Sequence, residues 1–114
     1  MSDDPAGGQT LQVVSRADDY LPTIAAALAA MSAPCDLVIY NAGMDRHEHS
    51  AIGGLRGVTR ETLAERERLV FAWARGRGIP VAFVLAGGYA SPRLSREALA
   101  GLRRLTVAAA ANAV

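Results

Sequence analysis

Two short apolar runs constrain the fold of this chain more than any other feature. They are "CDLVIY" at residues 35–40 and "VAFVLA" at residues 81–86, and both contain β-branched residues. Apolar runs of this length are typical of strands that are covered on both faces. We therefore predict strands near residues 36–40 and 80–85, and Cys35 is expected to be a small buried hydrophobic residue beside the first.

A strand and a helix are expected before the first apolar run. The segment "TLQVV" at residues 10–14 favours a short strand. Apolar residues then recur at helical spacing, with Asp18 or Asp19 available as the N-cap and Pro22 in the first turn, where a missing N–H does no harm. The helix should stop before Pro34, because the residue preceding a proline is pushed out of the helical region.

Two further helices are predicted between and after the apolar runs. Thr59 can cap the second helix, and Gly76 or Gly78 can end it. Ser95 can start the third. The apolar stripes that should face the core are Leu63, Val70 and Ala74 in the second helix, and Ala98, Leu102, Leu105 and Ala109 in the third.

The order of elements is strand, helix, strand, helix, strand, helix, which predicts an α/β fold with a parallel sheet. In such a sheet the carboxyl ends of all strands lie at the same edge, where α/β proteins bind ligands. The loops after Tyr40 and after Ala86 should therefore open into the same crevice. It follows that Asp45 and Tyr89 should face the same crevice.

Bulk composition excludes several classes of protein. The 114 residues suit one domain, the net charge is +1, and the twelve basic residues are all arginines dispersed along the chain. A nucleic-acid binder more often has a clustered basic stripe. The apolar stretches are too short and too interrupted to span a membrane, so no nucleic-acid or membrane partner is expected.

The N-terminal segment "MSDDPAGGQT" is acidic, small and polar. It has no apolar core of a signal peptide, which makes the cytoplasm the expected location. Residues 1–10 are expected to form a flexible tail. The single cysteine excludes a disulfide framework within one chain.

The loop after the first apolar run is dense in potential ligands. Asp45 fits two interpretations: a turn aspartate that caps local amides, or a metal or substrate ligand. His47 and His49 flank Glu48 and could form a metal cluster, although residues two apart in a short loop rarely converge. Solvated loop histidines are the favoured interpretation, and His47 is kept as a weaker metal candidate.

Glycines mark both loops. Gly53, Gly54 and Gly57 precede a helix and could bind phosphate at its N-terminus, but the segment lacks the lysine of a P-loop. The simpler interpretation is a loop that must pass close to other backbone. Gly87 and Gly88 predict a tight turn that aims Tyr89 back over the strand ends.

Taken together, "DLVIYNAGMDRHE", "IGGL" and "PVAFVLAGGY" resemble the C-terminal part of the histone deacetylase superfamily, which includes the acetylpolyamine amidohydrolases. "DDYL" at residues 18–21 resembles the start of the helix that precedes these motifs. The resemblance implies a three-layer α/β fragment of an arginase/deacetylase-like parallel sheet with flanking helices. It assigns residues 11–114 to the C-terminal portion of a deacetylase-like domain.

The resemblance also implies roles for individual residues. Asp45 falls on the aspartate that ligates zinc in the family, and Tyr89 on the tyrosine that donates a hydrogen bond to the substrate carbonyl. Gly88 accompanies Tyr89 at the catalytic position. Gly53, Gly54 and Gly87 are expected to line the substrate channel.

This sequence departs from the family pattern upstream of these motifs. The family's other two zinc ligands, an aspartate and a histidine two residues apart, have no counterpart here, and neither does its pair of adjacent histidines. We therefore expect zinc to bind weakly or not at all, and the chain to be inactive alone. An upstream complementary fragment could complete the site.

Two other functions stay open from the sequence. One is a non-catalytic module that self-associates or binds a partner through an unpaired sheet edge. The other is a small α/β domain that binds a phosphate or nucleotide through the loop from Gly53 to Gly57. The substrate, which could be acetyl-lysine, an acetylpolyamine or another N-acyl compound, is not specified by these residues.

Overall fold

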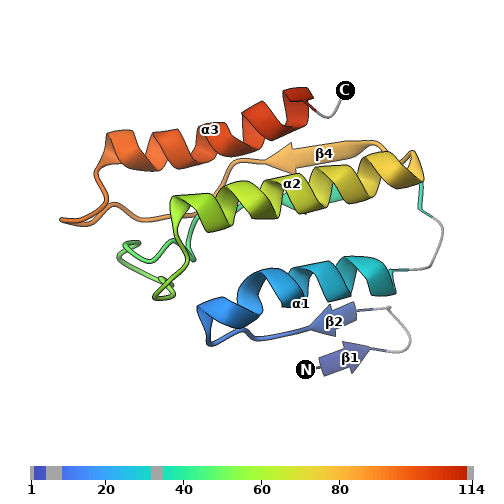
Figure 1. Cartoon of the computed structure of the whole chain (residues 1–114), viewed down its shortest axis with the longest axis horizontal. Helices are drawn as coiled ribbons and strands as arrows, with labels where there is room; N and C mark the ends of the chain where they lie inside the picture. Colours follow the sequence, from blue (N-terminus) through green and yellow to red (C-terminus); the bar gives the residue numbers. More distant parts are fainter. Residues whose placement is uncertain (1, 5–8, 32–34, 113–114) are drawn as a thin grey trace.

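The fold is an α/β arrangement in which three helices accompany a two-stranded parallel sheet (Figure 1). A computed structural model describes residues 2–4, 9–31 and 35–112. Its elements, in chain order, are β1 (Ser2–Asp4), β2 (Gln9–Leu11), α1 (Ala17–Ala30), β3 (Val38–Asn41), α2 (Arg60–Arg77), β4 (Val81–Val84) and α3 (Arg96–Asn112). The predicted α/β class, with a parallel sheet and flanking helices, is confirmed. No helix of the described residues is long and apolar enough to cross a membrane.

Strands β3 and β4 pair in parallel, as predicted, with Val38 opposite Val81 and Asn41 opposite Val84. α2 connects them, so both strands end at the same edge (Figure 1). This geometry places the loop after β3 beside the loop after β4.

The N-terminal strands differ from the sequence prediction. The strand expected at residues 10–14 is β2, which ends at Leu11 and pairs antiparallel with β1 in a sheet of its own. The expectation that it belongs to the parallel sheet is therefore wrong. Within residues 1–10, the described segments Ser2–Asp4 and Gln9–Thr10 are paired strand, while the flexibility of that tail stays a prediction.

Helix α2 has the ends that its sequence predicts. The Thr59 hydroxyl accepts a hydrogen bond from the Thr62 amide at 3.3 Å, and Thr62 Oγ1 accepts one from the Thr59 amide at 3.1 Å. This reciprocal capping box satisfies two amides that the helix itself leaves free. At the other end Gly78 takes a left-handed conformation with φ of 66°, which glycine adopts at little cost.

Helix α1 begins earlier than predicted. Its first residue is Ala17, and the N-cap residue Arg16 makes no side-chain cap. Asp18 and Asp19 therefore lie inside the first turn, where their negative charge interacts favourably with the helix dipole. Pro22 consequently lies inside the helix rather than in its first turn.

Helix α3 begins after Ser95, whose hydroxyl accepts a hydrogen bond from the Ala98 amide at 3.1 Å. Its buried residues are Leu99, Leu102 and Thr106. The predicted stripe is correct at Leu102 but wrong at Ala98, which is exposed. The buried face is thus turned by about one residue from the predicted one. It includes Thr106, which a search for apolar residues alone does not mark.

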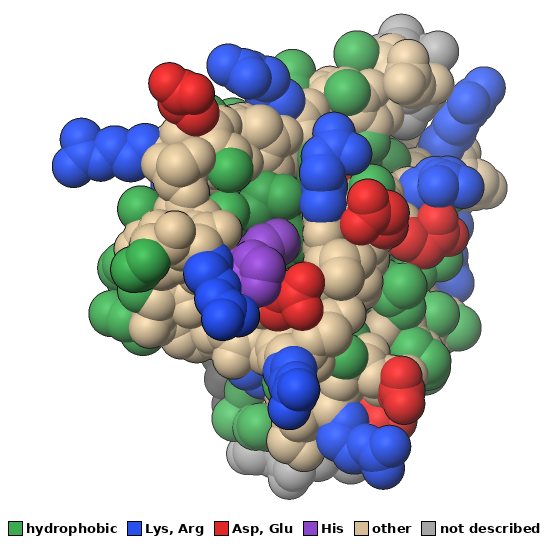
Figure 2. All heavy atoms as spheres, turned by 60° about the vertical axis from the view of Figure 1, so that its left-hand side comes forward, with side chains coloured by type: hydrophobic (Ala, Val, Ile, Leu, Met, Phe, Trp, Pro, Cys, Tyr) green, Lys and Arg blue, Asp and Glu red, His purple; other side chains and the backbone are tan. Residues whose placement is uncertain are grey.

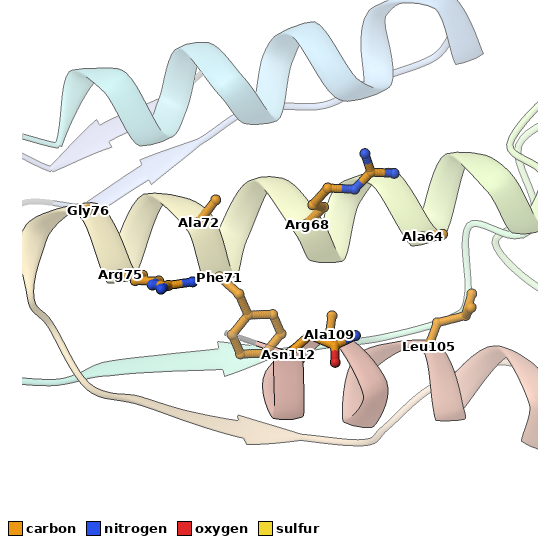
Figure 3. Close-up of a pocket in the computed structure, with 9 residues that line it drawn as sticks. All are labelled: Ala64, Arg68, Phe71, Ala72, Arg75, Gly76, Leu105, Ala109 and Asn112. Carbon is orange, nitrogen blue, oxygen red and sulfur yellow. The ribbon is translucent and has the colours of Figure 1, made fainter. Parts of the chain in front are cut away.

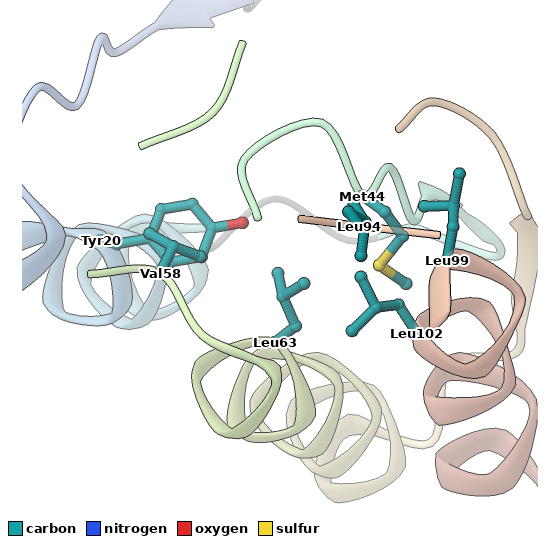
Figure 4. Packing of buried hydrophobic residues seen from close by; sticks show 7 residues of the cluster. All are labelled: Tyr20, Met44, Val58, Leu63, Leu94, Leu99 and Leu102. Carbon is teal, nitrogen blue, oxygen red and sulfur yellow. The ribbon is translucent and has the colours of Figure 1, made fainter. Parts of the chain in front are cut away.

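The core lies where α2 and α3 meet the loop after β3. Met44 and Leu63 are fully buried there, and Figure 4 shows Leu63 between the Tyr20–Val58 side of the cluster and the side chains from the loop and α3. The cluster consists of Tyr20, Met44, Val58, Leu63, Leu94, Leu99 and Leu102. Because Met44 directly precedes Asp45, the core anchors the loop that carries this carboxylate.

The two strands of the parallel sheet bury one face only. Their burial alternates along the chain, and Ile39 and Val84 are 72% and 51% exposed. The prediction that these strands are covered on both faces is therefore wrong for the described residues. Cys35 is likewise exposed rather than buried.

A charged pair lies within the core. Glu67 is fully buried and accepts hydrogen bonds from the Tyr40 hydroxyl, the Thr106 hydroxyl and Arg66 Nε, the last at 2.7 Å. Burial raises the pKa of Tyr40, so its hydroxyl keeps its proton and donates. Burial by itself would lower the pKa of Arg66, but the hydrogen bond to Glu67 raises it above its usual value.

Removal of the Glu67 carboxylate is expected to destabilise the fold strongly. Glu67→Ala leaves the buried Arg66 guanidinium without its charge partner, and such losses cost about 3–5 kcal/mol. Glu65→Ala is the matched control on the same helix, because its 2.9 Å pair with Arg68 is solvent-exposed and worth less than about 1 kcal/mol. Urea unfolding of both variants measures the difference. Equal losses would contradict a special role of the buried pair.

Candidate functional site

The loops after β3 and β4 meet through the Asp45 carboxylate. Asp45 Oδ1 accepts a hydrogen bond from the Gly88 amide, across 43 residues of sequence. Gly87 is packed so closely that a Cβ there would lie 2.6 Å from Asp45 Oδ1. The parallel sheet thus brings Asp45 and Tyr89 to one edge, as predicted.

Tyr89 has a fixed backbone and an exposed ring. Its amide donates to Ser50 Oγ at 3.2 Å, and its carbonyl accepts from the Ala51 amide at 3.2 Å. The residue as a whole is 47% exposed. The turn therefore presents the phenol at the surface while the two loops hold its main chain.

The two histidines lie in different surroundings. His47 is buried, with 7% exposure, so the expectation of a solvated side chain is wrong for it. His47 Nδ1 accepts a hydrogen bond from the His49 amide at 3.1 Å, and the two rings meet edge to face with centroids 5.5 Å apart. Burial lowers the pKa of His47, which keeps its imidazole neutral. In this loop His47 acts as a local structural acceptor.

Figure 2 shows this edge of the molecule from outside. Histidine side chains lie near the middle of the face, next to acidic and arginine side chains. A depression of about 290 Å³ opens at the strand ends. Its lining residues are Asn41, Gly43, Asp45, Arg46, Arg66, Ala86 and Gly87. The Asp45 carboxylate therefore faces a small polar hollow that solvent can enter.

The glycine loop between β3 and α2 folds tightly on itself. A Cβ at Gly54 would lie 2.9 Å from the Ser50 carbonyl, and one at Gly53 would lie 3.4 Å from Asp45 Cβ. The interpretation that this loop passes close to other backbone is confirmed. The Gly57 amide donates to Glu48 Oε1 at 3.3 Å, so a carboxylate occupies one of the donors that a phosphate would use.

Arg66 on α2 holds the loop after β3 in place. Arg66 Nη1 donates to the Gly43 carbonyl at 2.6 Å and to the Tyr20 hydroxyl at 3.1 Å. Sequence patterns missed this contact, because an adjacent Arg–Glu pair suggests a solvated helix face. The available signal was spacing: Glu67 lies four residues after Leu63 and three before Val70, on the apolar face of α2.

A larger cavity lies elsewhere, between α2 and α3 (Figure 3). It measures about 670 Å³, and the Phe71 ring points into the space between the helices while Arg68 and Arg75 extend from α2. None of its lining residues comes from the loops after β3 or β4. The polar groups of the candidate site therefore gather at the smaller hollow.

Comparison with known proteins identifies the family. The model of the histone deacetylase domain matches residues 10–105, which is most of the chain. The chain belongs to the histone deacetylase family. Its resemblance to this family, inferred from the motifs around Asp45 and Tyr89, is confirmed.

Two relatives show how much of such a protein the chain covers. Histone deacetylase 2 of Arabidopsis thaliana is 32% identical over 102 residues, which are 84% of this chain and 26% of that protein. An uncharacterised protein of Picosynechococcus sp. (strain ATCC 27264 / PCC 7002 / PR-6) is 47% identical over 55 residues, 48% of this chain and 18% of that protein. The chain thus spans about a quarter or less of these relatives.

The metal chemistry of the histone deacetylase family can be compared with the residues present. Family members are generally zinc-dependent. Asp45 has the carboxylate chemistry of an oxygen ligand: it lines the hollow at the strand ends, and its Oδ1 accepts a hydrogen bond from the Gly88 amide. Within the described residues, however, no three His, Cys, Asp or Glu side chains converge as a metal site would require. The residues present here do not by themselves fit a complete zinc site.

The close approach of Gly87 to Asp45 predicts that Gly87→Ala disrupts the site. Gly87 has φ of 73°, and its Cβ would clash with both carboxylate oxygens, so we expect a loss of about 1–3 kcal/mol. Gly76→Ala is the control, because Gly76 lies inside α2 and a Cβ there would meet no neighbouring group within 4 Å, so alanine should stabilise by about 0.5–1 kcal/mol. Thermal unfolding compares the two. A neutral Gly87→Ala would contradict the packing around Asp45.

Proposed function

We propose that this chain supplies part of the active site of a zinc-dependent deacetylase that hydrolyses N-acetyl amides. The observation that carries the proposal is the hydrogen bond from the Gly88 amide to Asp45, which joins the two loops at the carboxyl edge. Membership of the histone deacetylase family supports it. The substrate class we favour is acetyl-lysine or an acetylpolyamine.

Asp45 would contribute one oxygen ligand to the metal. Its Oδ1 is held by the Gly88 amide, and the residue lines the hollow at the strand ends, where we expect the other oxygen to meet the metal. A carboxylate held in this way needs little reorganisation when a cation arrives. Zinc would polarise the amide carbonyl and activate water, and both effects are needed for amide hydrolysis.

Tyr89 would stabilise the developing negative charge on the substrate oxygen. Its phenol is exposed, and its backbone is fixed by hydrogen bonds to Ser50 and Ala51. A phenol donor placed where the charge develops stabilises the transition state more than the ground state. Gly53, Gly54 and Gly87 are candidate channel residues: Gly53 and Gly87 pack against Asp45, and Gly54 packs against the backbone of the loop that carries it.

The rest of the active site would come from another part of a deacetylase domain. This chain matches about a quarter of the Arabidopsis deacetylase, and its described residues hold no complete set of metal ligands. An upstream complementary fragment would supply the remaining ligands and the histidine base. We therefore propose that the chain is inactive alone.

Association through the sheet is a second candidate function. The outward face of β3 and β4 exposes Ile39 and Val84, and Leu37 before β3 is 52% exposed. Exposed apolar side chains on one face of a sheet favour contact with another polypeptide, either a second copy or the complementary fragment. Size-exclusion measurement of the purified chain tests self-association, and a monomer at all concentrations would contradict it.

A cytoplasmic location completes the proposal. The chain has one cysteine, Cys35, and it is exposed. A free exposed thiol is stable in a reducing compartment.

The isolated chain is expected to bind zinc weakly. One carboxylate and a histidine whose Nδ1 already accepts a hydrogen bond cannot provide the three ligands of a catalytic site. Isothermal titration should show no binding tighter than about micromolar, which corresponds to roughly 8 kcal/mol. Tight stoichiometric binding would contradict the expectation, and His47→Ala would then show whether His47 is responsible.

Asp45 and Tyr89 should have separable effects once the site is completed. With a complementary fragment that carries the missing histidines and ligands, Asp45→Ala should abolish both zinc binding and deacetylation. Tyr89→Phe should keep the metal and lower the rate by about 10²–10³-fold, as expected for an oxyanion donor. Asp36→Ala is the control, because Asp36 is an exposed carboxylate before β3, at the opposite edge. Turnover that survives both site substitutions would contradict the proposed function.

A further inference from the structure

One peptide group in the candidate site is held from both sides. The Gly87 carbonyl accepts a hydrogen bond from Arg103 Nη2 at 2.9 Å, and the Gly88 N–H donates to Asp45 Oδ1. These two groups belong to the same trans peptide bond, so they point in opposite directions. Arg103 on α3 and Asp45 after β3 therefore fix the plane of this peptide between them.

The peptide needs such restraint because both of its residues are glycines. Gly87 and Gly88 have φ values of 73° and 88°. Glycine populates positive φ about as readily as negative φ, so these residues do not themselves fix the backbone conformation. A rotated Gly87–Gly88 peptide would turn its carbonyl toward the Asp45 carboxylate and remove the hydrogen bond. Tyr89 follows directly, so its direction depends on the same peptide.

Arg103 is directed at this peptide and not at a carboxylate. It lies half-buried on α3, and within the described residues it forms no ion pair. Its neighbour Arg104 is exposed. A guanidinium on the carbonyl draws electron density from the peptide and strengthens the N–H donor at its other end.

We infer that Arg103 is a positioning residue that orients the Gly87–Gly88 peptide, and through it the Asp45 carboxylate and Tyr89. This inference rests on the proposed function for its catalytic meaning. Its structural content concerns the chain alone: Arg103 holds the peptide so that the Gly88 amide occupies one carboxylate oxygen and leaves the other for a ligand.

Hydrogen exchange of the Gly88 amide, followed by NMR on the full chain, tests the inference. Arg103→Met keeps the aliphatic stem and removes the guanidinium, and should speed Gly88 exchange by about tenfold or more. Arg103→Lys keeps the charge without the planar fork and should give an intermediate rate. Arg104→Met is the matched control and should leave Gly88 unchanged.

The Leu63 amide, bonded to the Thr59 carbonyl at 3.1 Å in α2, reports on the fold as a whole. Unchanged Gly88 exchange in Arg103→Met, or an equal rise at Leu63 and Gly88, would overturn the inference. If Arg103→Met does not fold, the same exchange measurement is made on Arg103→Gln, and the same two results would overturn the inference.

A second readout connects Arg103 to catalysis. In a completed, zinc-loaded assembly, Arg103→Met should lower kcat about tenfold and change KM little, because it displaces groups that act on the transition state. A change in KM with kcat unchanged would overturn the catalytic part of the inference. If the wild-type assembly shows no turnover, the proposed function fails, while the exchange measurement still decides the role of Arg103.

Discussion

The buried pair of Arg66 and Glu67 is the interaction on which this structure depends. From adjacent positions on α2, these two side chains reach Tyr20 on α1, Tyr40 on β3, Thr106 on α3 and the carbonyl of Gly43 before the Asp45 loop. An ion pair in an apolar core is costly to desolvate, and it persists because almost every charge-bearing atom has a partner. Unlike apolar contacts, these hydrogen bonds are directional. They therefore determine how the elements are oriented relative to one another, and not only that the elements pack together.

The candidate site uses a similar arrangement on a smaller scale. Arg66 holds a carbonyl in the loop after β3, and Arg103 holds one in the loop after β4. Between the two, the Gly88 amide meets the Asp45 carboxylate. Loops rich in glycine would otherwise move independently of the sheet, and side chains from two helices tie them to rigid elements.

Local and periodic features of the sequence predicted most of the fold. The apolar runs located β3 and β4, and Thr59 and Gly78 marked the ends of α2, because strand composition and capping depend on neighbouring residues only. The shared edge of Asp45 and Tyr89 followed from the parallel topology. The antiparallel pairing of β2 with β1 was missed, since the short polar segment Ser2–Asp4 carries no periodic signal. The contacts of Arg66 and Arg103 were missed because arginines on a helix resemble solvated residues until the neighbouring elements are known.

The parallel pairing of β3 with β4 also determines the order in which the site can form during folding. Val38 and Val81 are partners, so the chain must close a loop of more than forty residues before the strands meet. Formation of α2 shortens this loop, because a helix advances only about 1.5 Å per residue. Asp45 and Gly88 lie beyond the paired residues, so pairing of the strands in register brings the two loops together. Any delay in strand pairing therefore leaves the two halves of the site apart.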